Sequence, residues 1–63
     1  MKRTAVQVGY EIVKILLEFG EMRKSVLMRK ANVSKDQIDH QLETGLIEKK
    51  ESYRKVVISL PFN

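Results

Sequence analysis

Residues 25–47 read SVLMRKANVSKDQIDHQLETGLI, a run in which apolar residues recur at helical spacing. The pattern predicts two short helices, 25–31 and 34–44, joined by a tight turn at Asn32 and Val33. Apolar residues on both helices and in the turn form one shared seam: Leu27, Ala31, Val33, Ile38 and Leu42. This combination is a helix-turn-helix, a motif that usually holds its second helix in a groove of DNA.

The ends of these two helices carry local capping signals. Ser25 is expected to cap the first helix, and Ser34 to cap the second with Gln37 as its capping-box partner. Gly45 is expected to end the second helix, because glycine enters the left-handed conformation at little cost. Both helices are therefore predicted from residues close to them in the chain.

The segment 4–19 is predicted to be a longer helix that Gly20 ends. One apolar seam suits the domain core: Ala5, Val8, Ile12, Ile15, Leu16 and Phe19. A second seam lies beside it: Val6, Tyr10, Val13 and Leu17. A helix on a one-sided core needs only one such stripe, so we expect the second to contact another copy of the chain. The alternative is a helix nearly engulfed by its own domain. Gly9, between the seams, would permit close approach of another backbone.

The C-terminal part, 46–60, is predicted to be a β-hairpin. Its strands are expected at 46–50 and 54–60, around a turn at 51–52. Apolar residues alternate along the second strand, as in a half-buried strand: Val56, Ile58 and Leu60. Residues 21–24 show no clear period and are expected to form a short extended segment that pairs with a strand.

Basic residues gather in two places. The window 23–35 contains five bases and no acid: Arg23, Lys24, Arg29, Lys30 and Lys35. The hairpin end holds a second group around one aromatic residue: Lys49, Lys50, Tyr53, Arg54 and Lys55. Such residues are typical of phosphate contacts, with the hairpin as a wing on the DNA backbone. The alternatives are a solvated charged face and a lysine-protected edge strand.

The helix at 34–44 supplies the candidate base-reading residues: Ser34, Lys35, Gln37, His40 and Gln41. Lysine suits guanine and glutamine suits adenine, whereas His40 is either a surface histidine or a base or phosphate contact. Acids on the exposed face oppose DNA along the whole helix: Asp36, Asp39 and Glu43. Only Asp36 has a local reason, since it lies near the positive end of the helix dipole. Base reading is therefore expected at the start of the helix.

The composition indicates one small domain, 1–63, with an anionic partner. Twelve Lys and Arg against eight Asp and Glu give a net charge of +4. No cysteine and one histidine predict neither a disulfide nor a metal site, and no cofactor or small-molecule ligand is expected. The chain has no phosphate-binding glycine loop and no paired metal-ligand spacing, so an enzyme is not expected. The absence of an 18-residue apolar run predicts a cytoplasmic protein without membrane contact.

The order of helix, short extended segment, two helices and hairpin resembles a winged helix. Its motif is carried by Ser25, Leu27, Met28, Ala31, Asn32, Val33, Ser34, Gln37 and Ile38, then Gly45, Leu46, Ile47 and Glu48. Over residues 12–53 the chain is similar to a family of small archaeal winged-helix proteins, which includes coiled-coil-dimer chromatin proteins and virus- or plasmid-borne regulators. The spacing from Ile38 to Gly45 and the Tyr53-Arg54 pair also resemble mercury-resistance-regulator and excisionase winged helices.

The resemblance implies an α+β winged helix-turn-helix, with three helices followed by a hairpin wing. It also implies double-stranded DNA binding by a homodimer, with four residues towards the major groove: Ser34, Lys35, Gln37 and Gln41. The predicted function is that of a small transcriptional regulator. The alternative is a protein–protein interaction module that uses the acidic helix face and the excess apolar surface of the first helix.

Overall fold

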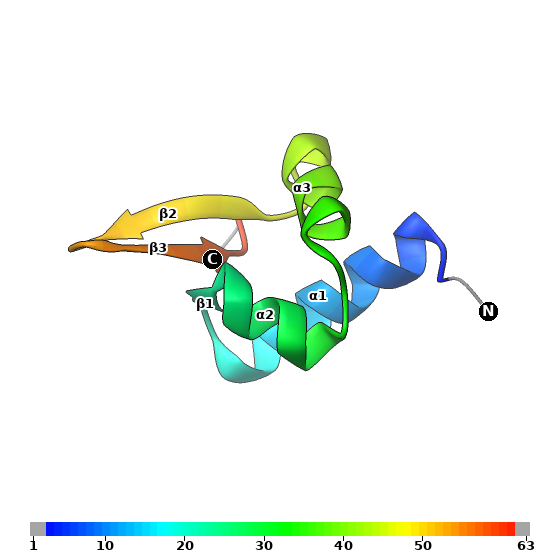
Figure 1. Cartoon of the computed structure of the whole chain (residues 1–63), viewed down its shortest axis with the longest axis horizontal. Coiled ribbons are helices and arrows are strands. Elements are labelled where there is room, and N and C mark those ends of the chain that lie inside the picture. Colours follow the sequence, from blue (N-terminus) through cyan, green and yellow to red (C-terminus); the bar gives the residue numbers. More distant parts are fainter. Residues whose placement is uncertain (1–2, 62–63) are drawn as a thin grey trace.

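The computed structural model describes residues 3–61, so residues 1, 2, 62 and 63 of the predicted 1–63 domain lie outside it. Within the described part are three helices and three strands, in the order α1 (Ala5–Phe19), β1 (Met22–Arg23), α2 (Lys24–Ala31), α3 (Lys35–Thr44), β2 (Glu48–Ser52) and β3 (Lys55–Ser59) (Figure 1). The predicted α+β class is confirmed, and the arrangement is compatible with helices followed by a hairpin wing. No helix among residues 3–61 is long and apolar enough to cross a membrane.

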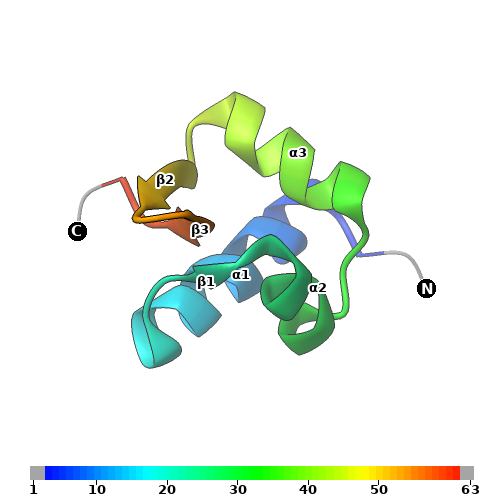
Figure 2. The same cartoon turned by 60° about the vertical axis from the view of Figure 1, so that its left-hand side comes forward.

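The sheet is antiparallel, with β3 between β1 and β2. Ile58 of β3 pairs with Met22 of β1 and with Lys49 of β2. The predicted pairing of residues 21–24 with a later strand is therefore confirmed at Met22–Arg23. The three helices gather beside the sheet (Figure 2), while the far end of the hairpin extends beyond them (Figure 1).

Two of the helices begin at complete capping boxes. The hydroxyl of Ser34 accepts from the Gln37 N–H at 3.3 Å, and the Gln37 side chain accepts from the Ser34 N–H at 2.8 Å. Thr4 forms the same arrangement at the start of α1. Gly45, with φ of 83°, ends α3 in the left-handed conformation, as predicted. The predicted boundaries of α3 are therefore confirmed by the geometry that generates them.

The predicted cap of α2 is wrong. The helix begins at Lys24, so Ser25 lies inside its first turn and is not the cap. Arg23 is the cap residue, and its side chain makes no capping hydrogen bond. This early start has a physical reason: β1 runs directly into α2, and Arg23 is already extended by its pairing with Val57.

The hairpin differs from the prediction in its turn and in the start of its first strand. Glu51 and Ser52 pair with β3, and the turn lies at Tyr53 and Arg54. β2 begins at Glu48, because Leu46 and Ile47 form a bend after α3. Tyr53 has φ of 58° and a fully exposed side chain. Two-residue hairpin loops favour positive φ because this matches the twist of the strands.

The core lies between the helices and the face of the sheet that carries Ile58. It contains most of the predicted seam and residues of α1 and the sheet: Val8, Ile12, Leu16, Met22, Leu27, Ala31, Val33, Ile38, Ile47, Ile58 and Leu60. Leu42 is only partly buried and packs against this core. Val56 shares the Ile58 face but is exposed, because β3 has passed beyond the helices at that point. Half of the hairpin is therefore a projection without a core of its own.

Tyr53→Gly is expected to raise the free energy of unfolding by about 0.5–1 kcal/mol. Relief of the left-handed backbone outweighs the extra entropy that glycine loses on folding, and the exposed Tyr53 ring gives up no packing in the described chain. Denaturant unfolding followed by circular dichroism measures the change. Arg54→Gly is the matched control, because Arg54 does not have positive φ. A Tyr53→Gly chain no more stable than Arg54→Gly would contradict the assignment of strain.

Candidate nucleic-acid interface

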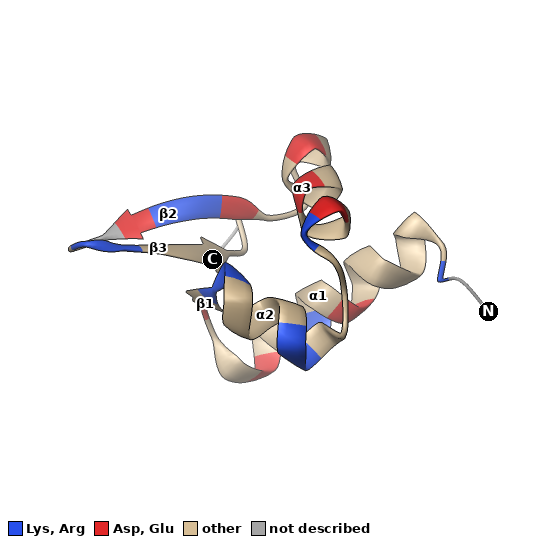
Figure 3. Cartoon of the chain, in the orientation of Figure 1, with Lys and Arg blue, Asp and Glu red and all other residues tan. Residues whose placement is uncertain are grey.

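Three lysines from three elements lie near enough to Asp39 for their charges to act on its carboxylate, and one of them is bonded to it. Lys24, the first residue of α2, donates a hydrogen bond from Nζ to Asp39 Oδ1 in the middle of α3. This bond lowers the pKa of Asp39; burial acts against it, and the charges of Lys24, Lys35 and Lys49 reinforce it. We call these four residues the Asp39 cluster. Figure 3 shows its basic segments at the start of α2, at the start of α3 and along β2.

The two adjacent lysines of β2 lie on opposite faces of the sheet. Lys49 pairs with the buried Ile58, so its side chain leaves β2 on the face that meets the helices. Lys50 pairs with Val57 on the other face, where its Nζ lies 3.9 Å from Glu21 Oε2. The predicted hairpin group is therefore divided, and only Lys49 joins the Asp39 cluster.

The remaining predicted phosphate contacts do not form one surface. Arg23 and Lys55 lie on the Lys50 face of the sheet, because Arg23 pairs with Val57 and Lys55 is two residues away from Val57. Arg29 and Lys30 lie in the last turn of α2, at the opposite end from Lys24. Tyr53 and Arg54 are exposed at the tip of the hairpin.

Lys30 also has a structural contact of its own. Its Nζ lies 4.4 Å from the centre of the Phe19 ring at the end of α1. A cation over an aromatic ring is a stabilising arrangement, so this lysine is already engaged within the chain. The contact with Phe19 therefore makes Lys30 a weaker candidate for a phosphate contact.

Of the five predicted base-reading residues, some are exposed and others are already bonded within the chain. Lys35 and His40 are exposed on α3. Ser34 and Gln37 bond each other in the capping box, which uses the Ser34 hydroxyl and the Gln37 side-chain oxygen. Gln41 is only 5% exposed, and its Nε2 donates to the Ala5 carbonyl at 2.9 Å. The prediction that Gln41 reads bases is wrong, because its amide holds α3 against the start of α1.

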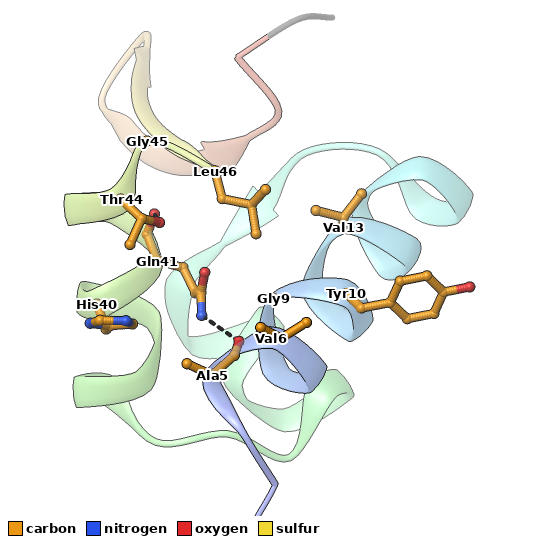
Figure 4. A pocket seen from close by; sticks show the side chains of 10 residues that line it. All are labelled: Ala5, Val6, Gly9, Tyr10, Val13, His40, Gln41, Thr44, Gly45 and Leu46. Carbon is orange, nitrogen blue, oxygen red and sulfur yellow. Dashed lines mark hydrogen bonds between the residues drawn. The ribbon is translucent and has the colours of Figure 1, made fainter.

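Gly9 is buried opposite Gln41, and its surroundings correct a second prediction. A Cβ atom at Gly9 would lie 2.7 Å from Leu46 Cδ2 and 3.0 Å from Gln41 Oε1. Two side chains of the same chain, and not another backbone, therefore occupy the space that glycine leaves. Gly9, Gln41 and Leu46 meet on the floor of an open groove between α1 and the end of α3 (Figure 4).

The second seam of α1 is exposed beside this groove, as predicted. Val6, Tyr10 and Leu17 are 82%, 71% and 64% exposed, and Val13 is partly buried. We call these four residues the outer strip. No Lys, Arg, Asp or Glu is among the described residues that line the groove: Ala5, Val6, Gly9, Tyr10, Val13, His40, Gln41, Thr44, Gly45 and Leu46. A patch without charged residues on this chain is suited to a protein contact, and not to phosphate.

Besides the Gln41–Ala5 bond, two further contacts were missed by sequence analysis because they join distant residues. Arg3 donates to the Ala31 carbonyl at 2.9 Å and to the Asn32 carbonyl, and it forms an ion pair with Glu11. It thereby caps the end of α2, whose carbonyls have no further helical partners. The Lys24–Asp39 bond is the second, and no local pattern indicates it.

Gln41→Ala is expected to lower the free energy of unfolding by about 1–2 kcal/mol, since it removes a buried hydrogen bond and leaves a small cavity. Thermal or denaturant unfolding measures the loss. His40→Ala is the control, because this exposed neighbour should change stability by less than about 0.5 kcal/mol. Equal effects of the two substitutions would show that the Gln41–Ala5 bond is not important for the fold.

Comparisons with known proteins leave the site to be interpreted from its own geometry. No protein-family model, curated protein or solved structure matches this chain. Among residues 3–61, no group of three or more His, Asp or Glu side chains could hold a metal ion. The features on which a function can be argued are therefore the Asp39 cluster, the hairpin tip, and the outer strip with its groove.

Proposed function

We propose that this chain is a winged-helix protein that binds double-stranded DNA as a homodimer and acts as a small transcriptional regulator. The observation that carries the proposal is the Asp39 cluster, in which α2, α3 and β2 each contribute a lysine around one acid. Two of these lysines, Lys35 on α3 and Lys49 on β2, are exposed, and they are well placed to contact phosphates of a duplex beside a helix of helix-turn-helix type.

The proposed docking puts the start of α3 in the major groove and the hairpin on the backbone. Lys35, exposed in the first turn, is the residue that would read guanine or bond a phosphate. Lys49 lies on the hairpin face that meets the helices, and Arg54 lies at the tip. Lys35 and Lys49 both act on Asp39, so the proposed contacts of α3 and of the hairpin lie on the side of the chain that carries this acid.

The acids of α3 repel DNA less in this docking than the sequence alone indicates. Asp36 lies in the first turn, where a negative charge suits the helix dipole. Asp39 is neutralised by Lys24. Glu43 lies in the last turn, away from the end that would enter the groove.

The proposed dimer uses the outer strip. Val6, Tyr10 and Leu17 expose apolar area on one side of α1, beside a groove without charged lining residues. A strip and a groove on the same face suit a two-fold contact, because each copy presents the same patch to the other. A chain this small also gains from association, since a short chain buries little core of its own.

The same apolar face supports a second candidate function, a protein-interaction module whose partner is a different protein. The predicted acidic face contributes less to it, because Asp39 is paired with Lys24 and only Asp36 and Glu43 are left exposed. DNA titration and measurement of oligomeric state separate the two candidates.

Lys49→Ala is expected to weaken binding to a mixed-sequence duplex and to reduce the salt dependence. The slope of log K against log salt is negative, and loss of one phosphate contact reduces its magnitude by about 0.9. Fluorescence anisotropy at several salt concentrations measures both quantities. Lys50→Ala is the matched control, because it removes the same charge from the opposite face of β2.

Two results would contradict this prediction in different ways. A wild-type chain that binds no DNA even at low salt would overturn the proposed function. Equal losses from Lys49→Ala and Lys50→Ala would show that DNA binding does not prefer the face of the hairpin that carries Ile58.

Tyr10→Lys/Leu17→Lys is expected to convert a dimer into a folded monomer. Both residues are mostly exposed, so the core should be unaffected, whereas four added charges at the interface should prevent association. Analytical ultracentrifugation measures the mass, and circular dichroism confirms folding. Glu18→Lys, which places a lysine on the polar side of α1, should remain dimeric. A wild-type monomer at the concentrations of the DNA titration would contradict the dimer.

A further inference from the structure

We infer that Asp39 withholds Lys24 from DNA phosphates, and so limits the part of DNA affinity that does not depend on sequence. The inference rests on the proposed function, and it gives one acid of α3 a definite role. Asp39 would act as a specificity-determining residue without contacting DNA itself.

The geometry shows that Lys24 is held in place before any partner arrives. Its side chain is 25% exposed, and its Nζ is bonded to Asp39 across the junction of α2 and α3. Lys35 and Lys49, by contrast, are exposed residues whose charges act on Asp39 without a hydrogen bond to it. Lys24 is therefore the one lysine of the cluster whose charge is already matched by a bonded acid.

A phosphate oxygen and a carboxylate oxygen compete for the same ammonium group. A lysine that contacts DNA adds affinity mainly because condensed counterions leave the phosphate that it neutralises. Lys24 must first leave Asp39 to do so, and an unpaired carboxylate would then lie close to the DNA backbone. Its net gain from phosphate is therefore reduced, and the other lysines supply most of the salt-dependent binding.

Asp39 stays ionised at the pH at which phosphate and carboxylate would compete for Lys24. The hydrogen bond from Lys24 and the charges of Lys24, Lys35 and Lys49 hold its pKa below the ordinary value, although burial acts the other way. The carboxylate therefore keeps its negative charge at neutral pH, and the pair with Lys24 persists in the unbound protein.

Glu43 supplies an internal control for this role. It lies four residues after Asp39 on α3, close to the same side of the helix. In the part of the chain that the structure describes, Glu43 is exposed and forms no salt bridge. Removing the charge of Glu43 changes the electrostatic potential around α3 but breaks no bond to a lysine.

The test is a double-mutant cycle on the full chain with Lys24→Ala, Asp39→Asn and the combined variant, and with Glu43→Gln as control. A fluorescent mixed-sequence duplex is titrated by anisotropy at several salt concentrations. Circular dichroism confirms that each variant is folded. Asparagine keeps the shape of the aspartate, so its effect reports the loss of charge.

Asp39→Asn is expected to raise affinity about threefold to tenfold at low salt and to steepen the salt slope by about 0.9, the value for one added phosphate contact. Lys24→Ala should leave the salt slope nearly unchanged in the wild-type background, although it lowers affinity by leaving Asp39 unpaired, and it should remove the added slope in the Asp39→Asn background. Glu43→Gln should raise affinity less and should leave the effect of Lys24→Ala unchanged.

Two outcomes overturn the inference alone. Either Lys24→Ala has the same effect in both backgrounds, or Asp39→Asn and Glu43→Gln change the salt slope equally. In both cases Asp39 acts only as a distant negative charge. If neither the wild type nor Asp39→Asn binds the duplex at low salt, the proposed function fails, and the inference fails with it.

Discussion

Ile58, the fourth of the five residues of the central strand, is fully buried, with Met22 paired on one side and Lys49 on the other. Side chains alternate between the two faces of a strand, so burial of Ile58 assigns a face to every residue of β2 and β3. It directs Lys49 towards the helices and Lys50 towards solvent beside Glu21. A slip of one residue would exchange these two lysines and dismantle the Asp39 cluster. The charge pattern of the surface is thus set by an apolar contact in the core.

The features that the sequence predicted correctly are those whose cause is local. The capping box at Ser34 and the left-handed end at Gly45 follow from residues within one helical turn. The seam of Leu27, Ala31 and Ile38 follows from helical periodicity, and all three residues are buried. The exposed outer strip could also be predicted, because α1 has more apolar residues than one core face can cover.

The features that the sequence could not give depend on contacts between distant residues. Lys24 and Asp39 are 15 residues apart, and Gln41 bonds a carbonyl 36 residues away. A glutamine on α3 looks the same in a sequence whether it reads a base or holds α1, and only packing separates the two roles. The cap at Ser25 failed because β1 extends the chain up to Arg23. The hairpin turn failed because no glycine or asparagine indicates that Tyr53 has positive φ.

α3 presents different sides to the two proposed contacts. Lys35 and Asp39 lie about 40° apart around the helix and face the lysines of α2 and β2, whereas Thr44 lies about 140° from Asp39 and lines the groove beside α1. A second copy on the outer strip would therefore not cover the side of α3 proposed for DNA. The Gln41–Ala5 bond joins α3 to α1, so α3 would be held rigidly relative to a dimer formed through α1. The spacing of two such helices would then follow from how the outer strips pack. In the proposed dimer, the apolar contact would therefore select the spacing of half-sites on DNA.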